Sequence, residues 1–118
     1  TKEKFTVFTP TEQHLSVNMT DGFSQLLLSC LEKSVKNVVL NLGQVGSMEA
    51  GIATMLLQLQ QQFYEEQASF IICELQPQVE QWLDEGEWLE LMNVTPTESE
   101  AWDIVQMEEI ERELLGDE

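Results

Sequence analysis

The chain has 118 residues, of which 42% are hydrophobic, and its formal net charge at pH 7 is −17. This length and composition suit one globular domain with a modest core and argue against a disordered chain. The net charge argues against nucleic-acid binding, because an acidic surface repels phosphate backbones.

The acidic residues are concentrated in the second half of the chain. Residues 61–118 carry seventeen Asp and Glu residues and one base, Arg112, whereas residues 1–60 carry five acidic residues and four lysines. These acidic residues either form a solvated exterior or attract a partner with a basic surface, and both interpretations stay open. No apolar run approaches the length of a membrane span, and the N-terminus lacks the apolar stretch of a signal peptide. We therefore expect a cytoplasmic protein.

The first half of the chain predicts a hairpin, a helix, a strand and a second helix. FTVFT (5–9) and LSVNM (15–19) alternate in the manner of paired strands. A helix is expected from about Gly22, capped by Thr20 or Asp21. NVVLNL (37–42) is apolar on both faces, which is typical of a central strand. The helix expected over about 50–65 has a core stripe at helical spacing, formed by Ile52, Met55, Leu56, Leu59 and Phe63.

The second half continues the alternation of strands and helices. ASFIICEL (68–75) is a second buried strand, and Pro77 opens a short helix that Gly86 ends. A short extended piece near LMNV (91–94) precedes Thr97 to Glu100, which fit the capping box of a last helix reaching about Leu115. The order of elements predicts one α/β domain over residues 1–118, with a largely parallel sheet and helical cover.

The last helix carries two apolar stripes on nearly opposite faces. Ala101, Ile104 and Val105 cluster on one face, and Met107, Ile110 and Leu114 cluster on the other. A single straight helix cannot bury both stripes against one sheet, so the first half should pack on the domain. The acidic tail from about residue 107 should kink, project or dock elsewhere. It either frays or uses Met107, Ile110 and Leu114 to contact a partner or a second copy of the chain.

Reactive side chains are few. Cys30 and Cys73 lie among apolar neighbours and are expected to be buried hydrophobes, and His14 is the single histidine. With no second histidine, neither a His-based metal site nor a convincing catalytic triad can be assembled, and no cofactor is implied. Acidic pairs such as Glu108 and Glu111 share a helix face but are expected to form a solvated surface. The sequence therefore predicts a protein that is not an enzyme.

Several short motifs together resemble the STAS domain, which is shared by sulphate transporters and anti-sigma factor antagonists. They are a buried strand ending in NL (41–42), the V-x-x-M turn of 45–48, a Gly-Ile helix start at 51–52, the L-x-P-x-V turn of 75–79, and VTPTESEA (94–101). The resemblance implies a mixed β-sheet of four to five strands with about four helices packed mainly on one side. It also implies a bacterial regulatory protein that binds other proteins rather than catalysing a reaction.

The turn before the helix at about residue 50 departs from the pattern of the phosphorylatable members. The resemblance implies that those members carry a phosphorylated serine at the start of this helix. In this chain Ala50 precedes Gly51 at that position, and alanine has no hydroxyl. Ser47 is the nearest hydroxyl, and we expect it to cap backbone amides rather than to accept phosphate. Glu49 either complements the helix dipole or mimics a permanent phosphate.

This turn is therefore interpreted as a docking surface without its covalent switch. The expected contacts are small residues, an exposed methionine and outward positions of the following helix, namely Gly46, Ser47, Met48, Glu49, Ala50, Gly51, Ala53 and Leu57. The expected partner is an anti-sigma factor kinase or a transporter ATPase. The alternatives are a structural subunit or scaffold of a larger complex, or a homodimer component.

Overall fold

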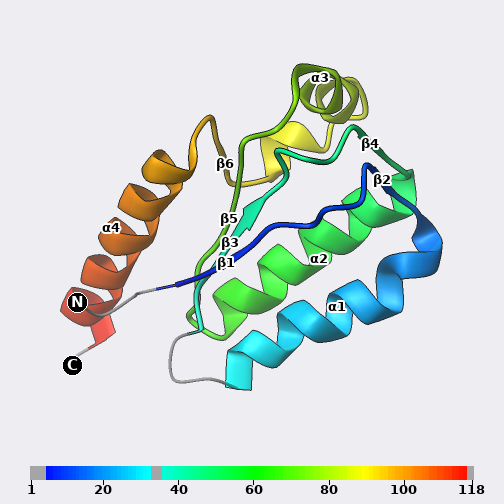
Figure 1. Ribbon diagram of the computed structural model, residues 1–118. Helices are drawn as coiled ribbons and strands as arrows, with labels where there is room; N and C mark the ends of the chain where they lie inside the picture. Colours follow the sequence, from blue (N-terminus) through cyan, green and yellow to red (C-terminus); the bar gives the residue numbers. More distant parts are fainter. Residues whose placement is uncertain (1–4, 33–35, 117–118) are drawn as a thin grey trace.

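The computed structural model describes residues 5–32 and 36–116, without the side chains of residues 115 and 116. Strands and helices alternate along most of the chain (Figure 1). The strands are β1 (Thr6–Phe8), β2 (His14–Leu15), β3 (Val38–Asn41), β4 (Ser47–Met48), β5 (Phe70–Cys73) and β6 (Val94–Thr95). The helices are α1 (Thr20–Leu28), α2 (Ala50–Glu65), α3 (Pro77–Glu85) and α4 (Glu98–Gly116), with short 3-10 turns η1 (Val17–Met19), η2 (Ser29–Glu32) and η3 (Leu89–Leu91).

The strands form two sheets, and every described pair is parallel. The main sheet has the order β1-β3-β5-β6, and β2 pairs with β4 in a small second sheet. The predicted α/β fold with four helices is confirmed. The predicted mixed sheet is parallel in these pairings, and the predicted hairpin between 5–9 and 15–19 is wrong. β1 and β2 instead pair with β3 and β4, which follow α1 in the sequence. The alternating apolar residues of 5–9 and 15–19 therefore belong to two separate parallel pairings.

The main sheet separates two apolar cores, because successive strand residues point to opposite faces. Val38, Leu40, Phe70 and Ile72 pack on the side of α1, α2 and α3, whereas Val39, Ile71 and Cys73 pack under α4. Figure 1 shows the same division, with α4 on one side of the strands and α1 and α2 on the other. The expectation of helices mainly on one side is confirmed, and α4 covers the remaining face.

Two helices match their sequence patterns closely. α2 begins at Ala50 and ends at Glu65, and all five residues of its predicted stripe are buried. α3 has Pro77 in its first turn and ends before Gly86, as expected. These helices were predictable because apolar spacing, proline and glycine are local signals.

The segment between β1 and α1 differs from the expected strand. Strand β2 contains only His14 and Leu15, and Val17 to Met19 turn as η1 with Val17 half exposed. α1 then begins at Thr20 without a side-chain cap, because its N-cap residue is Met19. The predicted caps Thr20 and Asp21 therefore lie inside the helix.

α4 runs as one helix and buries its first stripe. The Thr97 hydroxyl accepts a hydrogen bond from the Glu100 amide at 3.2 Å, which is the cap half of the predicted capping box. Ala101 and Val105 are fully buried, and Ile104 packs beside them. Met107, Ile110 and Leu114 are each more than half exposed. The second half of α4 nevertheless stays on the domain, which the apolar stripes alone did not predict.

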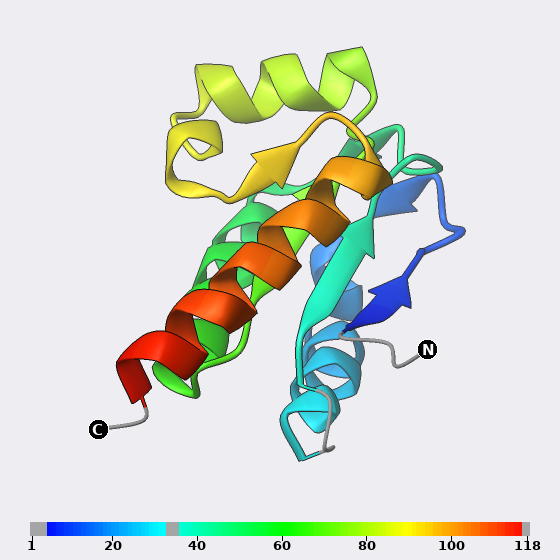
Figure 2. The same ribbon diagram turned by 90° about the vertical axis from the view of Figure 1, so that its left-hand side faces the viewer.

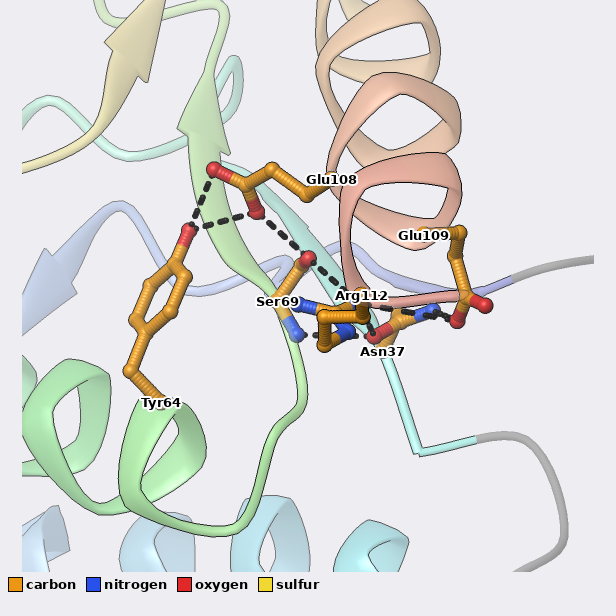
Figure 3. A network of polar contacts seen from close by, with 6 residues as sticks. All are labelled: Asn37, Tyr64, Ser69, Glu108, Glu109 and Arg112. Carbon is orange, nitrogen blue, oxygen red and sulfur yellow. Dashed lines mark hydrogen bonds and ion pairs between the residues drawn. The ribbon is translucent and has the colours of Figure 1, made fainter. Parts of the chain in front are cut away.

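A polar network holds the second half of α4 against the amino ends of β3 and β5 (Figure 3). The Tyr64 hydroxyl lies 2.8 Å from a Glu108 oxygen, and the Ser69 hydroxyl donates to Glu108 at 2.5 Å. Arg112 donates to Ser69 at 3.1 Å and to Asn37 at 3.2 Å. Burial and the Glu108 hydrogen bond raise the pKa of Tyr64 above its ordinary value, so this hydroxyl stays protonated and able to donate. Glu108 is thus a structural acceptor, and the expectation that it belongs to a solvated face is wrong.

We predict that Glu108→Ala lowers the free energy of unfolding by about 1–3 kcal/mol, because the Tyr64 and Ser69 hydroxyls lose their shared acceptor. Glu111→Ala, at an exposed position on the same helix, should change it by less than about 0.5 kcal/mol. Urea unfolding of both variants measures the difference. Equal midpoints would mean that the network does not hold α4.

Candidate partner-binding site

The turn between β3 and α2 is held in place by the chain segment around β2. The amides of Gly46 and Ser47 donate to the Gln13 carbonyl at 2.7 and 3.1 Å, and the Glu49 amide donates to the Leu15 carbonyl at 2.9 Å. These bonds extend the pairing of β2 with β4. Because backbone hydrogen bonds to one neighbouring segment fix the turn at Gly46, Ser47 and Glu49, its side chains are presented in a defined arrangement.

Three polar side chains meet on this turn. Ser47 Oγ lies 2.7 Å from His14 Nδ1, and His14 Nε2 lies 3.6 Å from Glu49 Oε2. Glu49 Oε1 accepts a hydrogen bond from the Val17 amide at 2.8 Å. Ser47 therefore bonds to a side chain, and the expectation that it caps backbone amides is wrong. Sequence reasoning did not include His14 in this site, because the contact spans a parallel pairing between distant segments and no local pattern marks it.

Glu49 is the N-cap residue of α2, and it joins the helix start to η1. Its extended backbone lets its carbonyl accept from the amides of Ile52 and Ala53, while its side chain reaches Val17 instead of capping its own helix. Gly51 allows this close approach, because a Cβ at that position would lie 2.5 Å from Val17 Cγ1. The carboxylate thus has a structural role beside its position near the positive end of the helix dipole.

The structure separates the expected contact residues into an exposed and a buried group. Ser47, Ala50 and Gly51 are exposed, and Gly46 and Glu49 are partly exposed. The expectation that Met48 and Ala53 face outward is wrong, since they are 5% and 0% exposed. Met48 follows Ser47 in a strand and takes the opposite, inward face, whereas Ala53 lies beside Ile52 and Leu56 on the core stripe.

Leu57 presents less surface to a partner than expected, because its side chain is only partly exposed and packs against the core. Thr54 and His14, which the sequence did not single out, are exposed near the turn. The exposed surface therefore combines small residues from the start of α2 with side chains from β2 and β4.

An apolar pocket of about 240 Å³ adjoins this surface on the side of α3. It is lined by Gly46, Ser47, Met48, Gln78, Val79 and Trp82. Met48 therefore contributes to a pocket wall although little of its side chain is exposed. The pocket thus adds apolar surface between the turn and α3.

The polar side chains that meet at this turn are open to solvent, and the buried thiol nearby in the sheet is not ionised. His14 and Glu49 have side chains about half exposed to solvent, and their 3.6 Å separation exceeds hydrogen-bond distance. The thiol of Cys73 is buried, and burial with the nearby Glu98 and Glu74 raises its pKa to about 12, so it is protonated at neutral pH. Within residues 5–32 and 36–116, no group of His, Cys, Asp and Glu side chains is arranged to hold a metal ion.

No helix among the described residues combines the length and the apolar character needed to cross a bilayer. This agrees with the hydropathy of the sequence, in which apolar runs are short.

Solved structures with the same fold include proteins of two kinds. A protein from Thermotoga maritima, described as a candidate anti-sigma factor antagonist, matches with a TM-score of 0.72 and 18% identity over 85% of this chain and 87% of its own. An anti-sigma factor antagonist (STAS) domain protein from Planctomyces limnophilus matches with a TM-score of 0.75 and 20% identity over 90% of this chain and 95% of its own. The murine Solute Carrier 26 family member A9 anion transporter matches with a TM-score of 0.73 and 14% identity over 88% of this chain and 18% of the transporter.

A comparison with curated protein sequences finds no match. The family model described as the STAS domain matches residues 1–101, which cover both sheets and the start of α4. The resemblance inferred from the sequence motifs is thereby confirmed, and the chain belongs to the STAS domain family.

Proposed function

We propose that this chain is a non-catalytic regulatory module that binds another protein through the turn at the start of α2, in the manner of an anti-sigma factor antagonist. The observation that carries the proposal is the rigid, exposed surface formed by His14, Ser47, Glu49, Ala50 and Gly51, whose backbone is fixed by hydrogen bonds to β2. Small exposed residues at a helix start allow a partner to approach the backbone closely, and the apolar pocket beside Trp82 supplies area that can be buried.

The proposed partner is an anti-sigma factor kinase or a transporter ATPase. Membership of the STAS family supports a protein partner, and the fold also occurs as a minor part of a transporter chain. The strongly acidic composition favours a partner surface with basic residues. The absence of a hydroxyl at Ala50 supports a module that scaffolds a complex without a phosphorylation switch at the helix start.

We predict that Ala50→Lys leaves the domain folded and weakens partner capture by at least about tenfold, because a long charged side chain would stand in the middle of the docking surface. Gln62→Lys, exposed near the far end of α2, is the matched control and should capture the partner normally. The measurement is affinity capture of the full chain from source-cell extract, quantified by mass spectrometry. Normal capture by the Ala50→Lys variant would contradict this site.

Ala53→Arg should behave differently from Ala50→Lys. Ala53 is fully buried, so an arginine there places an unpaired charge in the core and should destabilise the fold by about 3 kcal/mol or more. Thermal unfolding followed by circular dichroism distinguishes the two variants.

We further predict that no phosphate is found on residues 48–51 in the cell. Ala50 lacks a hydroxyl, and the Ser47 hydroxyl is engaged by His14. Intact-mass analysis after incubation with candidate kinases and nucleotide tests this, and Ser47→Ala should leave partner binding unchanged within about twofold, because the surrounding backbone keeps its bonds. A stoichiometric phosphoserine at Ser47 whose removal changes binding would overturn the switchless interpretation.

A further inference from the structure

The outer edge of β6 is a second surface suited to binding, separate from the turn at α2. β6 lies at one end of the strand order, and among the described strands it pairs only with β5. Figure 2 shows it as the short yellow arrow between α3 and α4. The Ile72 amide donates to the Asn93 carbonyl at 2.8 Å, and Ile72 is in register with Val94. In this parallel register the N–H and C=O of Val94 point away from β5, toward the edge of the sheet.

Two pockets flank this edge. The larger has a volume of about 590 Å³ and is lined by Leu75, Glu80, Leu89, Glu90, Met92, Val94, Thr95 and Pro96. The smaller has a volume of about 270 Å³ and is lined by Ile71, Met92, Asn93, Val94, Thr95, Ile104 and Glu108. Both pockets therefore meet at Met92, Val94 and Thr95.

The pockets open on opposite faces of the main sheet. Leu75 and Leu89 of the larger pocket pack against the core under α1, α2 and α3. Ile71 and Ile104 of the smaller pocket belong to the core under α4. Because the side chains of a strand alternate between faces, an extended segment beside Val94 would direct successive side chains into the two pockets in turn. Its backbone would meet the outward N–H and C=O of Val94.

The charge around the edge selects the kind of segment that fits. Glu80 and Glu90 line the larger pocket and are exposed, and the chain as a whole carries a net charge of −17. A second copy of this chain would bring the same strong negative charge to the contact, and like charges repel. A segment with apolar residues in its centre and lysine or arginine at its ends matches both the pocket walls and their rim.

We propose that the edge of β6 binds an extended, basic-flanked apolar segment of a partner protein by strand addition. The apolar residues of the segment enter the two pockets alternately, and its flanking cations lie near Glu80 and Glu90. This surface is independent of the turn at α2, so a partner could engage both or either one.

The test uses the full chain and two peptides of equal composition and charge. The probe KKLVLKK places its three apolar residues together, and its isomer LKKVKKL separates them. We expect the probe to bind saturably below about 1 mM, with amide shifts concentrated at residues 92–95 in nuclear magnetic resonance titrations. The isomer should bind at least about fivefold more weakly, because charge alone does not fill both pockets.

Two variants of the chain address the two parts of the proposal. Glu90→Lys should weaken probe binding at least about fivefold, whereas Glu66→Lys, an equal charge change at the end of α2, should not. Val94→Pro removes the outward amide without removing a bond to β5, and should also weaken binding. Val7→Pro is the matched control on the opposite edge of the sheet, and it should bind the probe normally. The Thr6 amide donates to the Asn37 carbonyl, so the Val7 amide faces away from β3 and its loss also removes no bond within the sheet. Circular dichroism establishes which variants are folded.

Equal binding of the two peptides, or unchanged probe binding by the folded Glu90→Lys variant, would overturn the proposal. Amide shifts scattered over acidic positions outside residues 92–95 would also overturn it, because they would indicate attraction by charge alone. A dimer in sedimentation experiments that Val94→Pro dissociates would identify a second copy as the occupant, and the proposed partner segment would be wrong.

Discussion

The parallel pairing of β3 with β5 is the constraint on which the rest of the molecule depends. Val38 to Asn41 lie in register with Phe70 to Cys73, and every residue of this pair except the partly exposed Asn41 is buried. A strand buried on both faces needs helical cover on both, so α4 has to close the side that α2 leaves open. The apolar stripe of α4 is short, however, and polar bonds from Glu108 and Arg112 to the amino ends of the strands hold its second half.

The same pairing fixes where a partner can approach. The carboxyl ends of parallel strands lie at one edge of the sheet, and residues 42–49, which include β4, connect β3 to α2 at that edge. Backbone bonds from Gly46 and Ser47 to Gln13 keep this turn beside β2. The site is therefore assembled from two segments that lie far apart in the sequence, and both belong to the small second sheet.

Local signals in the sequence predicted much of this structure, whereas contacts between residues far apart in the sequence were missed. Spacing, Pro77 and Gly86 placed α2 and α3, because each signal acts within a few residues. The parallel partners of β1 and β2 lie beyond α1, so alternation alone suggested a hairpin. Ala53 was assigned to an outward position of the helix, although its place beside Leu56 already put it on the core stripe. His14 and the Glu108 network join residues dozens of positions apart, and no periodicity marks such contacts.

Glu49 connects the architecture to the proposed absence of a switch. A phosphate mimic at a helix start would need its negative charge to face a partner. One oxygen of Glu49 accepts from the Val17 amide and the other lies near His14, so these contacts engage a carboxylate that is only partly exposed to a partner. The carboxylate therefore fixes η1 against the start of α2, and this fixation limits the conformations of the turn before any partner arrives. A surface that is already ordered loses little conformational entropy on binding. Regulation of such a module would then come from competition among partners or from their abundance rather than from a covalent change at Ala50.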